Sequence, residues 1–148
     1  SDRFSAELKV DAPATQSLLY QSKGQVFAMP QTLEELWPIL EANPKHRFVT
    51  GATDLGLHVT KRHASYDCLV SLERIEGMRG ISETDDAWII GAATPLADIE
   101  DAAENNLRPL ARMLRFFGAR QIKNRGTLGG IPSMRWGWTP PVGVGMIR

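Results

Sequence analysis

Two short segments, residues 48–56 and 125–130, carry the residue types in this sequence that could bind a ligand. They read FVTGATDLG and RGTLGG. Successive backbone N–H groups in a tight glycine turn form a concave site for phosphate oxygens, because several donors point at one place. Glycine also permits backbone angles that a Cβ forbids, and we expect such angles at Gly51 and Gly56. The first segment therefore indicates an anion-binding turn, with the Thr53 hydroxyl as a further donor.

The alternative for the first segment is an ordinary turn between a strand and a helix, capped by Thr53 or Asp54. A helix that begins after Thr53 would also favour an anion at its positive end, so the two interpretations share one geometry. The segment has no Lys-Ser/Thr pair after its second glycine and does not match G-x-G-x-x-G. The motif alone leaves both interpretations open.

In the second segment, three glycines surround Thr127 and favour close approach of the backbone to a ligand. Lys123 and Arg125 are expected to raise the positive potential beside it. The alternative is a flexible loop with solvated charges. Two such segments on separate parts of one chain could bind the two ends of an extended phosphate-bearing ligand. The simplest such ligand is a dinucleotide cofactor with its diphosphate.

The elements that position the first segment follow from the hydrophobic pattern. A short strand is predicted at 26–28, followed by a helix whose N-cap is Thr32 and whose Glu35 completes a capping box. Pro38 is expected to kink that helix or to cost it a turn. Strands at 46–50 and 67–72 enclose the glycine turn and a short helix. This order predicts a small parallel α/β unit.

The second segment follows a predicted hairpin over 78–92 and two predicted helices. Thr94 is expected to be the N-cap of the first helix, with Pro95 as its first residue. The second helix is expected to run from about Asn106 to Phe117 with an apolar face. Its separate basic face consists of Arg108, Arg112 and Arg115.

The composition places the chain among globular proteins, with 43% hydrophobic residues. No apolar run approaches the roughly 18 residues of a membrane span, and no secretory signal pattern is present at residue 1. The one cysteine, Cys68, excludes internal disulfides and favours a reducing, cytoplasmic setting. Cys68 is expected to be an inert core thiol. We predict no metal site and no catalytic acid, base or nucleophile.

Charge is unevenly distributed along the chain. Residues 1–104 carry 9 Lys and Arg against 17 Asp and Glu, a net charge of −8, whereas residues 105–148 carry 8 basic residues and no acid. Either the C-terminal third faces an anion or an acidic partner, or the two parts neutralise each other in the fold, which we favour. The arginine face lacks the interleaved aromatics of a nucleic-acid site, so docking to an acidic subunit is preferred over nucleic acid.

Taken in this order, the two segments resemble the FAD-binding domain of the xanthine dehydrogenase family, most closely its bacterial small subunit. FVTGATDLGLHVTK is similar to the family's first flavin loop, which holds the pyrophosphate. LRFFGARQIKNRGTLGG is similar to its second loop, and PQTLEELWPIL is similar to its first helix. The resemblance extends over residues 20–130.

The resemblance implies an α+β, two-lobed FAD-binding domain of the vanillyl-alcohol oxidase or CO dehydrogenase flavoprotein type. We expect a linker or arm over 1–23, a small α/β lobe over 24–78, the start of the second lobe over 79–130 and an atypical tail over 131–148. Phe117 matches the aromatic residue that lies against the flavin ring. The other residues implied to bind FAD are Phe48, Val49, Thr50, Gly51, Ala52, Thr53, Asp54, Leu55, Thr127, Gly129 and Gly130.

In this family, electrons leave a purine at a molybdenum centre, pass two iron–sulfur clusters, reach FAD and go to NAD as hydride. The resemblance therefore implies a flavin-dependent oxidoreductase subunit. Its partners would be a molybdopterin-binding large subunit, an iron–sulfur domain and NAD, with neither membrane nor nucleic acid involved. An interpretation from another class is a non-catalytic module whose glycine segments are structural and whose arginine face docks a partner.

The chain departs from the family pattern after Gly130. Ile131 stands where the family has asparagine, and no aspartate follows. The tail is rich in Trp, Pro and Gly and predicts neither strand nor helix. We therefore expect a fragment with an incomplete second lobe, or a product whose last 18 residues come from a shifted reading frame or a faulty gene model.

Overall fold

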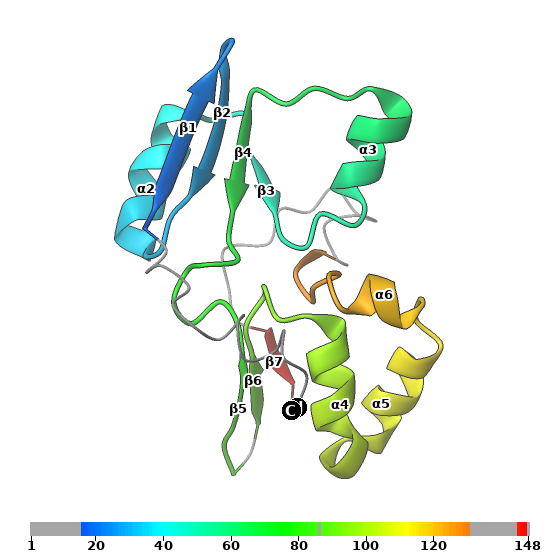
Figure 1. Ribbon diagram of the computed structural model, residues 1–148. Helices are drawn as coiled ribbons and strands as arrows, with labels where there is room; N and C mark the ends of the chain where they lie inside the picture. Colours follow the sequence, from blue (N-terminus) through cyan, green and yellow to red (C-terminus); the bar gives the residue numbers. More distant parts are fainter. Residues whose placement is uncertain (1–15, 86, 131–144, 148) are drawn as a thin grey trace, which may run out of the picture.

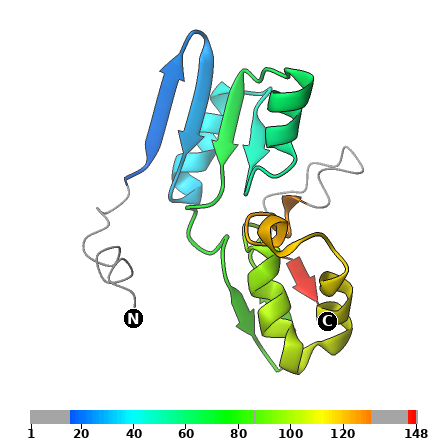
Figure 2. The same ribbon diagram turned by 45° about the vertical axis from the view of Figure 1, so that its right-hand side comes forward.

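Two small sheets, each with its own helices, make up the part of the chain that the computed structural model describes, residues 16–85, 87–130 and 145–147 (Figure 1). The first sheet has the strand order β1-β2-β4-β3 and the second has the order β5-β6-β7. Figure 2 shows the sheets one above the other, joined by the chain between β4 and β5. The elements are β1 (Leu18–Ser22), β2 (Gln25–Met29), α2 (Leu33–Ala42), β3 (Arg47–Val49), α3 (Leu55–Arg62), β4 (Cys68–Ser71), β5 (Ile81–Glu83), β6 (Trp88–Ile90), α4 (Leu96–Asn106), α5 (Arg108–Arg115), α6 (Arg120–Lys123) and β7 (Gly145–Ile147).

The first sheet contains the predicted parallel unit, because β2 and β3 each pair in parallel with β4. The expectation of a linker over 1–23 is wrong for β1, which pairs antiparallel with β2. Lys23 and Gly24 connect these strands with φ angles of 49° and 80°. Two successive positive φ angles are typical of the type I′ turn that joins tight hairpins. The chain therefore enters the sheet before the predicted strand at 26–28.

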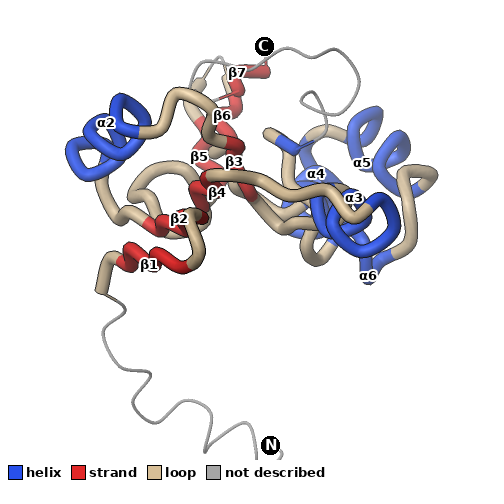
Figure 3. The backbone as a smooth tube through the Cα atoms, turned by 90° about the horizontal axis from the view of Figure 1, so that it is seen from above, coloured by secondary structure: helices blue, strands red, loops and turns tan. Residues whose placement is uncertain are grey.

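Helix α2 covers one face of the first sheet, as Figure 3 shows from above. The predicted N-cap is confirmed, since the Thr32 hydroxyl accepts the Glu35 amide at 3.3 Å, but the return bond of the capping box goes to the residue before the cap. The Glu35 carboxylate accepts the Gln31 amide at 2.9 Å. The helix continues through Pro38 to Ala42 without losing a turn. Leu36 of α2 belongs to a buried, mostly aliphatic core cluster that consists of Ala28, Leu36, Cys68, Val70, Leu72, Ile75, Met78 and Ala93.

The second sheet begins with the predicted hairpin, in which β5 and β6 pair antiparallel with Ile81 opposite Ile90. Strand β7 then pairs antiparallel with β6, so the prediction that the tail contains no strand is wrong at Gly145–Ile147. The rest of the predicted tail lies outside the described residues. The β6 side chains Trp88 and Ile90 are buried against helices α4 and α5.

Helices α4, α5 and α6 lie together beside the second sheet (Figure 3). Thr94 is not the N-cap of α4, which begins at Leu96 after Pro95. The Thr94 side chain instead accepts the Gly80 amide at 2.9 Å and donates to the Gly80 carbonyl at 3.0 Å. Helix α4 ends at Asn106, where we expected the next helix to begin, and α5 ends at Arg115 before it reaches Phe117.

Ion pairs join the basic C-terminal third to acidic residues of the preceding part, as the favoured interpretation of the charge predicted. Arg120 pairs with Asp101 at 2.6 Å, and its hydrogen bond lowers the pKa of the Asp101 carboxyl below the usual value of 3.8. The other such pairs are Arg115–Glu104, Arg120–Glu100, Lys123–Glu100 and Arg125–Glu73.

Candidate functional site

The two glycine segments meet at the junction of the two sheets (Figures 1 and 2). The first turn, residues 50–54, connects β3 to α3, and the second turn, residues 125–130, follows α6. The hydroxyl oxygens of Thr50 and Thr127 are 2.7 Å apart, within hydrogen-bond distance. The fold thus brings together two segments that the sequence singled out separately.

Glycine is required at position 51 by the backbone conformation and by a close contact with the second turn. Its φ angle is +66°, in the left-handed region, and a Cβ at this position would stand 1.7 Å from the carbonyl oxygen of Arg125. Ala52 follows with φ of 58°. The left-handed angle that we also expected at Gly56 is absent. Gly56 lies in α3 without a positive φ angle and has open space around its Cβ position. Of the two glycines in the first segment, only Gly51 permits a close approach.

The second turn is fixed against the chain that precedes α4. The Leu96 amide donates to the Gly126 carbonyl at 2.9 Å, and the Gly129 amide donates to the Ala92 carbonyl at 2.8 Å. A Cβ on Gly129 would be 2.9 Å from that same carbonyl oxygen. Thr127 is buried, with 3% exposure. The alternative of a flexible loop is therefore wrong, because hydrogen bonds hold this turn on the second sheet's side of the junction.

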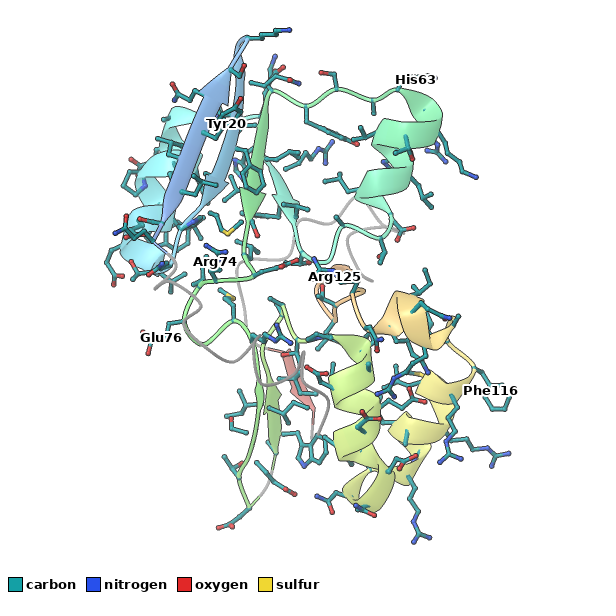
Figure 4. All side chains as sticks on the ribbon, viewed as in Figure 1. Tyr20, His63, Arg74, Glu76, Phe116 and Arg125 are labelled. Atoms are coloured by element: carbon teal, nitrogen blue, oxygen red, sulfur yellow. The ribbon has the colours of Figure 1, made fainter. Side chains whose placement is uncertain are left out.

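The charges beside the turns are paired within the described residues, so the expected excess of positive potential is wrong. Lys123 is buried, and its Nζ lies 2.5 Å from a Glu100 carboxylate oxygen and 3.1 Å from the Leu114 carbonyl. The exposed Arg125 guanidinium donates to Glu73 Oε1 at 3.1 Å, and Arg125 lies between the two sheets (Figure 4). Lys123 therefore stabilises the helices, and Arg125 alone stays near the turns with its charge partly compensated.

Backbone amides supply the donors that an anion would use. The N–H groups of Thr53, Asp54 and Leu55 donate to no other group in the part of the chain that the structure describes. Asp54 is the N-cap of α3, but its side chain makes no capping hydrogen bond. These amides lie at the positive end of the helix dipole, which favours negative charge. The residues present thus fit a diphosphate group, although the Gly51 amide is already bonded to Glu73 Oε1 at 2.7 Å.

Two aromatic residues predicted to bind FAD lie apart from this arrangement. Phe48 is in β3, where it packs on the first core with its ring centroid 4.9 Å from that of His46. Phe117 lies between α5 and α6, and 39% of its surface is exposed. Its neighbour Phe116 points outward from the molecule (Figure 4). The roles of Phe48 and Phe117 stay predictions.

Sequence reasoning missed Glu73, which contacts both turns. Its Oε1 accepts the Gly51 amide and the Arg125 guanidinium. A signal was present, because Glu73 follows β4, and parallel neighbouring strands such as β3 and β4 end at the same edge of a sheet. Its position after a strand adjacent to the glycine turn would have indicated it.

Comparison with known proteins identifies the family. The family model described as the FAD binding domain in molybdopterin dehydrogenase matches residues 21–131. The chain therefore belongs to this family of FAD-binding domains. The predicted fold class and the assignment of FAD as the family's cofactor are confirmed.

The individual relatives are much longer than this chain. Xanthine dehydrogenase from Calliphora vicina is 28% identical over 127 residues, which cover 78% of this chain and 9% of that protein. Nicotinate hydroxylase from Emericella nidulans is 30% identical over 129 residues, which cover 76% of this chain and 10% of that protein. The chain thus spans about a tenth of the length of the curated relatives it matches.

Solved structures show the same fold. A carbon monoxide dehydrogenase from Hydrogenophaga pseudoflava aligns with a TM-score of 0.66 and 26% identity, covering 72% of this chain and 38% of that one. Quinoline 2-oxidoreductase from Pseudomonas putida 86 aligns with a TM-score of 0.63 and 25% identity, covering 69% and 36%. Among the described residues, no helix has the length and apolar character needed to cross a membrane.

Proposed function

We propose that this chain binds FAD at the junction of its two sheets, with the diphosphate held between the first and second turns. The observation that carries the proposal is the convergence of these turns, in which Thr50 and Thr127 lie 2.7 Å apart and Gly51 packs on the Arg125 carbonyl. Membership of an FAD-binding family supports it, as do the nearby amides that donate to no group in the described part of the chain.

Each predicted residue has a role in this proposal that follows from its place in the chain. The amides of Thr53, Asp54 and Leu55 hold phosphate oxygens at the beginning of α3. Phe117 lies against the flavin ring, which requires the chain between α5 and α6 to close on the cofactor. The remaining residues shape the two turns around these donors: Phe48, Val49, Thr50, Gly51, Ala52, Thr127, Gly129 and Gly130.

When bound, FAD supplies the electron-transfer chemistry, and the protein supplies position and electrostatics. Accordingly, no residue of this chain acts as acid, base or nucleophile in the proposal. We propose further that the parent enzyme is cytoplasmic and oxidises a purine, with electrons arriving from iron–sulfur clusters and leaving to NAD. The xanthine dehydrogenases among the relatives support this substrate class. An iron–sulfur domain and a molybdopterin-binding large subunit would be the partners.

Titration of the purified chain with FAD tests the proposal directly. We expect a yellow complex that releases FAD on denaturation, measured by the absorbance and fluorescence of the flavin. ADP, which contains the diphosphate, is expected to compete, whereas riboflavin, which lacks it, is expected to bind far more weakly. A folded chain that takes up no FAD, or that binds riboflavin as tightly as FAD, would contradict a diphosphate site at the turns.

A second candidate function, docking of a partner subunit, is favoured by the surface of α5. Phe116 and Met113 are 84% and 58% exposed there, beside Arg108 and Arg112 around a shallow hollow. Neither arginine forms an ion pair within the described ranges. A colourless, folded chain that still associates with a molybdopterin-binding large subunit would support this function.

A charge reversal measures the contribution of this surface. Arg112→Glu is expected to weaken association with the large subunit at least tenfold, because it places a carboxylate where an acidic partner surface would dock. Arg62→Glu at the exposed end of α3 is the matched control. Equal losses in the two variants would exclude the α5 surface as the docking site.

A further inference from the structure

Glu73 contacts both turns of the proposed FAD site through one carboxylate oxygen. Its Oε1 accepts a hydrogen bond from the Gly51 amide at 2.7 Å and another from Arg125 Nη2 at 3.1 Å. Gly51 belongs to the first turn and Arg125 to the second, so this oxygen links segments that come from opposite sides of the junction. The Gly51 amide is the one that begins the left-handed part of the first turn.

The backbone presents Glu73 at this place. The Leu72 amide donates to the Val49 carbonyl at 3.2 Å, which continues the β3–β4 pairing beyond the last paired residues. The next residue, Glu73, therefore lies beside the end of β3, where the first turn begins. Its own amide donates to the Ser71 hydroxyl at 3.4 Å. The position of the carboxylate is thus set by the sheet as well as by the turns.

The two contacts of the carboxylate differ in strength. Arg125 has 62% of its side chain exposed, and an ion pair so open to water contributes little by itself. The bond from the Gly51 amide has an ionised acceptor and a distance of 2.7 Å, and Glu73 is more shielded at 34% exposure. Hydrogen bonds to charged groups are stronger than neutral ones. The contact with Gly51 is therefore the stronger constraint on the turn.

We propose that Glu73 is a positioning residue for FAD binding: it holds the Gly51 amide and thereby fixes the first turn so that the following amides are available to the diphosphate. This inference depends on the function proposed above. Because Glu73 occupies the Gly51 amide, the anion binds to the amides of Thr53, Asp54 and Leu55. Positioning requires a hydrogen-bond acceptor at residue 73, and the negative charge is secondary.

Three variants of the full chain separate this role from the alternatives. Glu73→Ala removes the acceptor and is expected to weaken FAD binding about tenfold, the usual effect of losing a hydrogen bond to a charged group. Glu73→Gln keeps an acceptor for the Gly51 amide and is expected to restore affinity to within about threefold of wild type. Glu76→Ala removes an exposed carboxylate from the same segment, away from Arg125 (Figure 4), and is expected to change nothing.

Hydrogen exchange at the Gly51 amide provides a second readout that needs no cofactor. Exchange is expected to be at least tenfold faster in Glu73→Ala than in wild type or Glu73→Gln, because only the alanine leaves the amide without an acceptor. Tighter FAD binding by both Glu73 variants would overturn the proposal and make the carboxylate a competitor of the diphosphate. An unchanged affinity and exchange rate in Glu73→Ala would also overturn it.

The two readouts keep the inference distinct from the function on which it depends. If wild type binds FAD and Glu73→Ala binds it equally well, only the positioning role fails. If wild type does not bind FAD, the proposed function is wrong, and so is the role of Glu73 in FAD binding. The exchange rate of the Gly51 amide then shows only whether Glu73 holds the first turn.

Discussion

Replacement of Gly51 by alanine is the most direct perturbation of the contact between the two turns. A Cβ at this position would lie 1.7 Å from the Arg125 carbonyl oxygen, whereas real Cβ contacts below 3.0 Å essentially do not occur. The turns must therefore separate by at least about 1.3 Å. Alanine at φ of +66° adds a left-handed backbone cost of about 1–2 kcal/mol. Overpacking adds roughly 1–3 kcal/mol if the turns are held together.

One of these costs converts into an expected loss of FAD affinity. The free chain can relieve the clash by letting the turns separate, but a diphosphate held by both turns requires them together. The left-handed cost is present with and without FAD and cancels, so the overpacking cost of about 1–3 kcal/mol sets the expected loss of affinity, which is at least about fivefold. The assay is the dissociation constant of FAD from quenching of flavin fluorescence, with far-UV circular dichroism and a thermal melt to establish that the variant is folded.

Gly56→Ala is the matched control, because Gly56 lies in α3 with no atom within 4 Å of its Cβ position. This variant is expected to keep the wild-type affinity and to gain about 0.5–1 kcal/mol of stability, since alanine is the better helix former. The reasoning is refuted if folded Gly51→Ala binds FAD within threefold of wild type, or if the two glycine variants lose affinity equally.

Three further predictions concern stability. Lys123→Met leaves the buried Glu100 carboxylate with only the longer 3.8 Å contact to Arg120 and is expected to reduce the unfolding free energy by about 3 kcal/mol, most of which Glu100→Leu restores in the double variant, as measured by urea unfolding. Lys23→Asn suits the left-handed turn position better and is expected to add about 0.5–1 kcal/mol, seen as a higher melting temperature. The hydrogen bond from Arg120 lowers the folded-state pKa of Asp101 below its unfolded value of 3.8, so this stabilisation is present above pH 3.8 and is lost as pH falls through the folded pKa. The urea midpoints of wild type and Asp101→Asn should therefore differ at neutral pH and converge in acid.

The sequence pattern predicted correctly those elements whose stabilising contacts lie within a few residues of each other. The N-cap of α2 is an example, because Thr32 and Glu35 satisfy neighbouring amides without any distant partner. The parallel unit of β2, β3 and β4 was also predictable, since each strand carries its own apolar run. Strand β1 was not, because its sequence LLYQS shows no alternation of apolar and polar residues and its hairpin turn is Lys-Gly rather than Asn-Gly.

Errors arose where a side chain is used by a distant part of the chain. Thr94 has the residue type and position of an N-cap, but its hydroxyl bonds to Gly80 instead. Lys123 suggested a positive surface near the second turn, yet it is buried against Glu100. In each case a partner 14 or 23 residues away decided the role, and local spacing contains no information about that partner.

The candidate site contains two kinds of residue: one whose small size permits a close contact, and others whose backbone amides are proposed to bind the ligand. Gly51 was selected from the sequence as part of an anion-binding turn, but its small size is required by the Arg125 carbonyl, and its amide is taken by Glu73. Within the described residues, the donors left for a ligand are the next amides, from Thr53 to Leu55, and no residue type in the motif marks these amides as open. A backbone donor is invisible in the residue type, so a sequence can indicate where the turn closes but only the fold shows which amides stay open. In this chain Gly51 therefore joins the two turns at the junction of the sheets, and the anion binding that we propose depends on that contact.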